Sequence, residues 1–260
     1  MELKVRDIVK AINESVPESL QEGWDNSGIQ IGFEDMPVTT ILTCLEIDEA
    51  VAVEAINAGA QMIVSHHPLI FGGIKRIDSD DSLGRVIEML ICSGISVYSS
   101  HTPFDVVEGG NNDVLAAKLG LTGVETASED GFLKCGYLPA SMSLKDFVDY
   151  TADCLNLEAG QIRAAGRADA LVKRVGLCTG AGSDFAKAAK LAGCDVMVTG
   201  DVKHHEALDV IADGFNIVDA GHYGTEKFFA HSMGQRLEGI FGKNIKIIES
   251  NTVTDPFVMV

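Results

Sequence analysis

The first half of the chain alternates short apolar runs with amphipathic stretches, and this alternation predicts strands followed by helices. The apolar runs that predict buried strands lie at 39–47, 61–65 and 95–100. Helical spacing of apolar residues, or an Ala-rich run closed by glycine, predicts helices at 4–16, 49–59, 82–93 and 111–119. Strands that alternate with helices in this way are typical of an α/β fold.

The second half repeats the plan of the first. A shift of 134 residues without a gap places the strand–helix–strand segment 40–65 on 174–200. The matched pairs are Cys44 and Cys178, Ala52 and Ala186, Ala55 and Ala189, Ala58 and Ala192, Gly59 and Gly193, Val64 and Val198, and Ser65 and Thr199. Ala- and Gly-rich helices can match by coincidence, but the run of matched positions favours an internal duplication.

A later strand in each half leads directly into a His-x-x-x-acid motif. The predicted strand at 95–100 precedes HTPFD (101–105), and FNIVDAG (215–221) precedes HYGTE (222–226). The offset between these motifs is 121 residues, so the second copy lacks a short loop of the first.

The duplication predicts two similar α/β lobes, each a sheet flanked by helices, with a cleft at their strand ends. A polar stretch begins at 126 and marks a plausible boundary. We therefore expect 1–125 and 222–260 to form the first lobe, and 126–221 to form the second.

Composition and charge narrow the classes of function. A hydrophobic fraction of 46% with only 6 prolines indicates an ordinary globular protein. The net charge of −18 and the lack of a basic run make nucleic acid an improbable partner. No apolar run is long enough for a membrane helix, and the charged N-terminal stretch does not resemble a signal peptide, so we expect a cytoplasmic protein. The 6 cysteines include no C-x-x-C pair and are interpreted as reduced thiols, most of them packed in apolar segments.

Two adjacent histidines, His66 and His67, follow the predicted strand at 61–65. They stand at its C-terminal end, where α/β proteins place ligands. Neighbouring side chains of an extended chain point to opposite sides, so each imidazole can bind one of two ions lying side by side. Taken alone, such a pair is more often a surface or packed feature than a metal site.

Further potential ligands follow the other strands. His222 and Glu226 are four residues apart and lie on one face if this segment is helical. Asp105 follows the strand at 95–100, four residues after His101. Imidazoles and carboxylates that gather at the ends of apolar strands need a compensating charge, which divalent cations supply. Three imidazoles and two carboxylates without a thiolate suit Zn, Mn or Fe(II), and the sequence does not choose among them.

The chain resembles the GTP cyclohydrolase I type 2 family, also called the Nif-three-like family. The segments that carry the resemblance are WDNSGIQIG (24–32), SHHPLIF (65–71), HTPFDVVEGGNNDVLA (101–116), TGDVKHHEALD (199–209) and DAGHYGTE (219–226). They occur in the family's order and span most of the chain. The resemblance implies two α/β lobes, a dinuclear metal site in the cleft between them, and assembly into a hexameric ring.

The resemblance also implies roles for individual residues. His66 and His67 match paired histidines, one on each ion, and Asp105 matches the carboxylate after the third strand. His222 and Glu226 match the closing pair, with Glu226 bridging both ions. The reaction it implies is attack by water on C8 of the guanine ring of GTP, with release of formate.

Other polar residues have weaker predictions. His101 is predicted to be a hydrogen-bond donor or proton carrier beside the metals. His204 and His205 are predicted to contact substrate, with a solvated helix start as the equally weighted alternative. Asp201 stands at the repeat position of His67, which indicates that the second lobe has lost its own metal site. The Gly-rich turn at 179–184 is more typical of a tight turn, with Ser183 or Asp184 capping a helix, than of a phosphate site.

Three functions are compatible with these residues. A dinuclear-metal hydrolase of the GTP cyclohydrolase type is the leading hypothesis, with His101 and Glu226 as catalytic residues. A phosphoesterase would use the same centre. A non-catalytic metal-binding or interaction protein is the alternative from another class.

Overall fold

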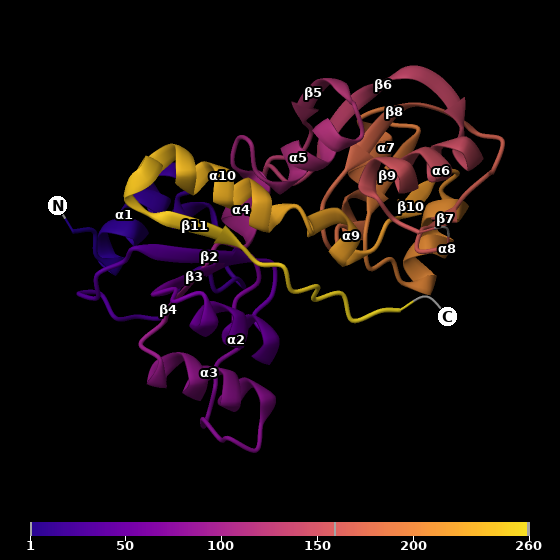
Figure 1. The fold of residues 1–260 in the computed structure, drawn as a ribbon. Coiled ribbons are helices and arrows are strands. Elements are labelled where there is room, and N and C mark those ends of the chain that lie inside the picture. Colours follow the sequence, from indigo (N-terminus) through magenta and orange to yellow (C-terminus); the bar gives the residue numbers. More distant parts are fainter. Residues whose placement is uncertain (1, 159, 259–260) are drawn as a thin grey trace. The chain divides into compact units, whose positions relative to one another are not determined.

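The computed structural model describes residues 2–158 and 160–258. The chain divides into two compact units, which are described separately. Unit 1 comprises Met1–Val107 and Phe229–Pro256, and unit 2 comprises Glu108–Phe228 and Phe257–Val260. Each unit contains a mixed sheet flanked by helices, which confirms the predicted α/β class (Figure 1).

The described part of unit 1 has a five-stranded sheet in the order β1-β4-β3-β2-β11. These strands are β1 (Gly28–Ile31), β4 (Ser96–Ser99), β3 (Met62–Ser65), β2 (Thr40–Cys44) and β11 (Lys246–Glu249). β1 is antiparallel to β4, and the other neighbours are parallel. Every residue of β2, β3 and β4 is buried, as expected for parallel strands covered on both faces.

Helices cover both faces of this sheet (Figure 1). α2 (Glu49–Asn57) and α3 (Ser82–Cys92) lie on one face, and α1 (Val5–Ser15) and α10 (Phe229–Phe241) lie on the other. The remaining helices of the unit are η1 (Glu18–Leu20), α4 (Thr102–Val106) and η3 (Gly242–Asn244).

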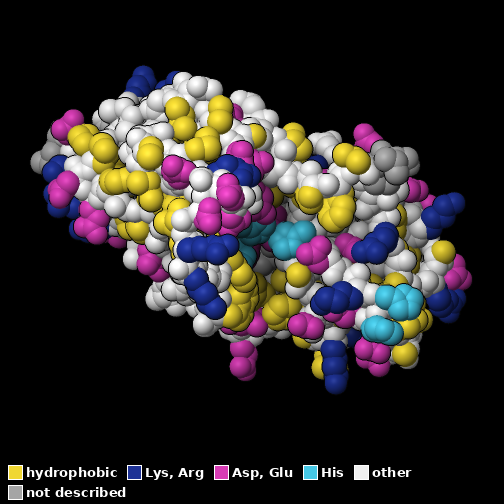
Figure 2. Space-filling model, turned by 90° about the horizontal axis from the view of Figure 1, so that it is seen from below, with side chains coloured by type: hydrophobic (Ala, Val, Ile, Leu, Met, Phe, Trp, Pro, Cys, Tyr) yellow, Lys and Arg dark blue, Asp and Glu magenta, His cyan; other side chains and the backbone are white. Residues whose placement is uncertain are grey.

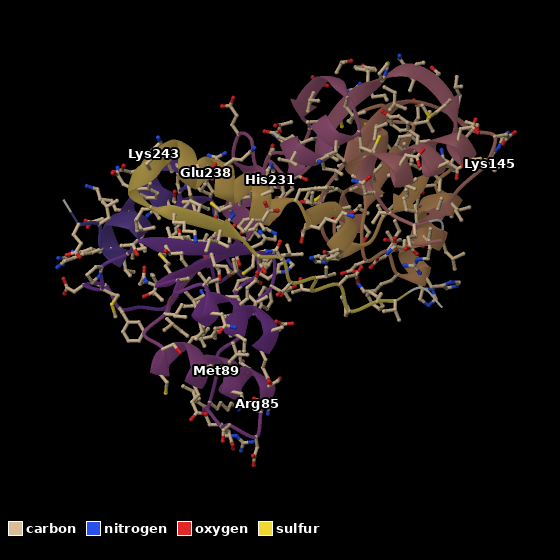
Figure 3. All side chains as sticks on the ribbon, viewed as in Figure 1. Arg85, Met89, Lys145, His231, Glu238 and Lys243 are labelled. Atoms are coloured by element: carbon tan, nitrogen blue, oxygen red, sulfur yellow. The ribbon has the colours of Figure 1, made fainter. Side chains whose placement is uncertain are left out.

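Local sequence explains where α2 begins and ends. The Asp48 carboxylate accepts a hydrogen bond from the Val51 amide at 2.8 Å and caps the N-terminus. Gly59 follows the helix with a φ of +66°, the left-handed conformation that ends many helices, as the sequence predicted. Arg85, which is labelled with Met89 on α3 in Figure 3, donates to Glu49 at 2.7 Å and ties the two helices together.

The described part of unit 2 has a six-stranded sheet in the order β5-β6-β8-β9-β10-β7. These strands are β5 (Thr122–Thr126), β6 (Lys134–Ser143), β8 (Leu171–Leu177), β9 (Val196–Thr199), β10 (Ile217–Asp219) and β7 (Arg163–Ala165). α5 (Asn111–Lys118) and α6 (Leu144–Leu155) pack on one apolar face of the sheet. α7 (Ala186–Leu191), which follows η2 (Ser183–Phe185), and α8 (His204–Ala212) pack on the other face.

The two sheets share a plan. β2, β3 and β4 are parallel neighbours, and so are β8, β9 and β10. β3 and β9 differ by the predicted shift at both ends, since Met62–Ser65 corresponds to Val196–Thr199. An antiparallel strand, β1 or β7, closes the sheet beside β4 or β10. This common plan agrees with the predicted duplication.

The units differ from the expected lobes at both boundaries. Residues 108–125, 222–228 and 257–258 were expected in the first lobe, but they belong to unit 2. β5 pairs with β6, and Leu115 and Ala116 of α5 contribute to the core of unit 2. α9 (His222–Glu226) follows β10 and is held by the Gly180 amide, which donates to the Thr225 hydroxyl at 3.0 Å. The described residues contain no helix that is both long and apolar enough to cross a membrane.

Candidate metal centre

Three histidines of unit 1 lie together at the C-terminal ends of β3 and β4. β3 ends at Ser65, which pairs in register with Ser99 of β4, so His66, His67 and His101 follow at the same edge. The ring centroids are 4.7 Å apart for His66 and His67, 5.1 Å for His66 and His101, and 5.3 Å for His67 and His101. One ring nitrogen from each lies within 4.8 Å of the other two.

The arrangement of His66 and His67 differs from that in an extended strand. Regular strand structure stops at Ser65, and both histidines lie in a bend. The alternation of side chains that the sequence argument assumed therefore no longer applies, and both imidazoles reach the same cluster.

Each of these three imidazoles is held by an oxygen at Nδ1. His66 Nδ1 lies 3.0 Å from the Ser100 carbonyl, His67 Nδ1 lies 2.5 Å from Glu46, and His101 Nδ1 lies 2.8 Å from Asp25. Carbonyl and carboxylate oxygens accept hydrogen bonds, so the proton is on Nδ1 and Nε2 is the nitrogen suited to a metal. Metal-binding histidines in proteins are oriented in this way.

Sheet register explains both carboxylate partners. Glu46 and His67 each stand two residues beyond a matched pair, Cys44 of β2 and Ser65 of β3. Asp25 precedes β1, and β1 runs antiparallel to β4 with Gly28 opposite Ser99. The approach to β1 and the exit from β4 therefore meet at one edge of the sheet.

Asp25 is a buried and ionised acceptor. Its side chain is fully buried, and Oδ2 accepts hydrogen bonds from the Thr102 hydroxyl at 2.5 Å and from the Ser27 hydroxyl at 2.8 Å. Burial acts to raise the pKa of Asp25, but the hydrogen bonds from His101, Thr102 and Ser27 outweigh it and hold that pKa below its ordinary value. A permanent negative charge behind His101 favours a proton on its Nδ1.

Asp105 adds a carboxylate to the cluster in unit 1. It lies in α4, which begins directly after His101, and it is 6% exposed. Its Oδ1 is 3.5 Å from His66 Nε2. A buried carboxylate beside a fully buried imidazole fits a cation binding site.

His222 and Glu226 form a second donor pair, in unit 2. His222 Nε2 lies 3.0 Å from Glu226 Oε2, and its Nδ1 lies 2.8 Å from Asp201 Oδ2. The imidazole is thus held at Nδ1 by a carboxylate, as in unit 1, and Glu226 is 3% exposed. Asp201, at the repeat position of His67, orients a predicted ligand.

The Gly-rich turn makes room for this pair. Gly180 has a φ of +62°, and a Cβ there would lie 2.4 Å from Glu226 Oε1 and 3.3 Å from His222 Nε2. A side chain at 180 would therefore occupy the space of the carboxylate. The expected N-cap is absent, because Ser183 donates its hydroxyl to Glu206 at 2.7 Å and no side chain caps η2.

The other three histidines lie outside these groups. His204 and His205 are exposed in the first turn of α8, with rings 5.4 Å apart. His231 lies on α10, where Figure 3 labels it, and its Nδ1 is 3.1 Å from Glu249. Among the described residues, none of the three belongs to a group able to hold a metal.

The donor groups suit a divalent transition metal. They combine imidazole nitrogens with carboxylate oxygens and no thiolate, which fits Zn, Mn or Fe(II). The 6 cysteines are free thiols, as the sequence predicted, although Cys92 is exposed. On the face shown in Figure 2, Asp and Glu side chains are scattered over the surface with Lys and Arg among them, and the described residues form no continuous basic patch there.

Sequence reasoning left two carboxylates without a role. No role was predicted for Glu46 or Asp25, although their carboxylates contact His67 and His101. A usable signal existed for Glu46, since it is the one charged residue of the run at 39–47 and lies near the end of that run. Asp25 required the antiparallel pairing of β1 with β4, which the sequence pattern did not indicate.

Comparison with known proteins identifies one family. The profile of the Duf34/NIF3 (NGG1p interacting factor 3) family matches residues 3–256. A GTP cyclohydrolase 1 type 2 homolog of Clostridium perfringens is 33% identical over 261 residues, covering 98% of this chain and 99% of that protein. A GTP cyclohydrolase 1 type 2 homolog of Clostridium acetobutylicum is 32% identical and covers 99% of both chains.

Two solved structures have the same fold as this chain. A hypothetical protein of Staphylococcus aureus superposes with a TM-score of 0.94 at 29% identity, and each chain is covered completely. A Bacillus cereus protein related to NIF3 superposes with a TM-score of 0.93 at 26% identity, again with complete coverage.

Proposed function

The chain belongs to the Duf34/NIF3 family, and from this premise we propose that it is a metal-dependent hydrolase of the GTP cyclohydrolase type. The observation that carries the proposal is the histidine cluster of unit 1, in which each Nδ1 is held by an oxygen. This arrangement leaves Nε2 as the nitrogen that would bind a metal ion in His66 and His67, and as the nitrogen that would carry a proton in His101. The relatives' names, GTP cyclohydrolase 1 type 2 homolog, support a nucleotide substrate.

We propose that two divalent ions, Zn, Mn or Fe(II), are held per chain. The proposed ligands are His66, His67, Asp105, His222 and Glu226. In this proposal Glu226 would serve as a ligand of both ions. Bound ions would lower the pKa of a water molecule and polarise the carbon that it attacks.

In this proposal, side chains of the protein transfer protons and contact the substrate. Asp25 fixes the His101 ring through Nδ1, so Nε2 can accept a proton and return it. In the proposed reaction, one water adds at C8 of the guanine ring and the ring opens to a formamide, and a second water hydrolyses this formamide, so that C8 leaves as formate and the amine stays on the pyrimidine. His101 and Glu226 are the proposed catalytic residues, and His204 and His205 are proposed to contact the substrate from α8.

A direct assay tests this function. Protein loaded separately with Zn, Mn or Fe(II) is incubated with GTP, and formate is measured with an enzyme-coupled assay. We expect formate from the native protein and none from Glu226→Ala, whereas His231→Ala, outside the donor groups, should retain activity. Failure to release formate with any of the three metals, together with hydrolysis of a phosphodiester by the same samples, would establish the phosphoesterase instead.

The family description favours a second candidate from another class. It names an interacting factor, so a metal-binding protein that acts through a partner is the alternative. In that case Glu226→Ala would lower stability or partner binding without any turnover to lose.

The assembly and location belong to the same proposal. We propose a homohexameric ring, which light scattering coupled to size-exclusion chromatography can test by its mass. We also propose a cytoplasmic location, because the 6 cysteines are free thiols.

A further inference from the structure

Two large aromatic side chains are exposed beside the histidine cluster. Trp24 is 59% exposed and Phe71 is 55% exposed, and their ring centroids lie 6.1 Å apart. Each ring also lies against His101, at 5.8 Å from Trp24 and 6.0 Å from Phe71. Large aromatic rings that are exposed together beside a candidate site often mark a ligand-binding surface.

The two rings come from different segments that are tied together. Asn26 Nδ2 donates to the Ile70 carbonyl at 2.6 Å, and the Ile70 amide donates to Gln30 Oε1 at 3.2 Å. These bonds join the residues that neighbour Trp24 and Phe71. Trp24 is followed directly by Asp25, which is bonded to His101. The rings are therefore held in place before any ligand arrives, which reduces the entropy lost on binding.

We propose that Trp24 and Phe71 form a stacking platform for the flat heteroaromatic ring of the substrate, and place that ring next to His101. The proposal deepens the proposed function, on which it rests for the nature of the substrate. Aromatic rings bind a nucleobase through its π face and tolerate different bases, so the platform supplies affinity and position for a ring. An aliphatic side chain of similar volume would bury area but would not stack.

The chain carries its own reporter, because Trp24 is the only tryptophan. Metal-loaded protein is titrated with GTP, with guanosine and with inorganic triphosphate while tryptophan fluorescence is followed. We expect GTP and guanosine to quench the emission and triphosphate to leave it unchanged. Quenching by triphosphate alone, or by none of the three, would overturn the proposal.

Variants separate stacking from simple burial. Phe71→Leu should weaken GTP binding about tenfold or more, and Phe71→Tyr should restore most of the affinity because it keeps a ring. Trp24→Leu should raise the KM for GTP in the same way with a smaller effect on kcat. Ile91→Ala removes an exposed apolar side chain from α3 and serves as the matched control, with no change expected. Equal affinities for Phe71→Leu and the native protein would refute the platform.

Two further outcomes keep this inference apart from the proposed function. If GTP quenches the emission but no formate appears, the hydrolase proposal fails and the platform stands. If formate is released and the KM is unchanged in Trp24→Leu and Phe71→Leu, the platform fails and the hydrolase stands. A third outcome would overturn the proposal: the tryptophan emission shifts only when the protein is diluted, and Phe71→Leu changes the mass of the assembly measured by light scattering. The two rings would then contact another copy of the chain.

Discussion

Gly180→Ala tests whether the Gly-rich turn exists to position Glu226. Residue 180 adopts a φ of +62°, and a Cβ there would lie 2.4 Å from Glu226 Oε1. Two effects are expected. The left-handed backbone costs an L-residue about 1–2 kcal/mol of stability. The collision meets the end of a long side chain, so it should displace the carboxylate rather than disrupt the fold.

A matched glycine separates these two effects. Gly214, also in unit 2, has a φ of +70°, and a Cβ added there would meet no atom within 4 Å. Gly214→Ala therefore carries the same backbone cost without the collision. Both variants should lose about 1–2 kcal/mol in urea unfolding of chelator-treated protein. Only Gly180→Ala should also lose metal affinity, by about ten- to a hundredfold, as when an orienting partner of a metal ligand is removed.

The assay is competition with a chromophoric chelator for Zn or Mn at neutral pH, alongside calorimetric titration. Equal metal affinities for Gly180→Ala and Gly214→Ala would refute the reasoning. Such a result would mean either that Glu226 is not a ligand or that residue 180 does not set its position.

Three further predictions concern stability. The pKa of Glu206 is held at about 2 by Lys203, through a side-chain and a backbone hydrogen bond, and by the Ser183 hydroxyl, against an ordinary 4.5. A carboxylate whose pKa is lowered in the folded state stabilises the fold at pH values above its ordinary pKa, and this contribution is lost as the pH falls toward 2. Glu206→Gln should therefore reduce the free energy of unfolding at neutral pH. The difference in that free energy between the variant and the native protein should narrow below pH 4.5, as urea unfolding across pH would show. Zn at about a hundred times its Kd should stabilise the native protein by about 2.7 kcal/mol, and Glu226→Gln should remove most of that gain in thermal unfolding; an equal gain in both would exclude Glu226 as a ligand. Leu90→Ala, at a fully buried site of α3, should cost about 2–5 kcal/mol, while Leu191→Ala, at an 81% exposed site, should stay within about 0.5 kcal/mol, and a similar loss for both would contradict the assigned core.

The predicted elements of unit 1 agree closely with the structure. The run at 61–65 forms β3 (Met62–Ser65), and the run at 95–100 forms β4 (Ser96–Ser99). Both runs are fully buried, so hydrophobic pattern alone identifies them. The segment of His222 and Glu226 is helical, as their spacing required, but α9 ends at Glu226 and α10 begins at Phe229, because the chain passes from unit 2 to unit 1 between them.

The sequence by itself determined which residues stand at strand ends. His66 and His67 had to follow β3 and His101 had to follow β4, because chain order and burial pattern define where each strand stops. Those positions alone identify the imidazoles as candidates for metal binding.

Only the tertiary structure decided which oxygens hold these imidazoles. Asp25 and His101 are 76 residues apart and meet because β1 lies antiparallel beside β4. Glu46 meets His67 through the register of β2 with β3, and Gly180 lies against Glu226 through the fold of unit 2. Strand order and register follow from the packing of the whole sheet, and the local hydrophobic pattern carries little information about either.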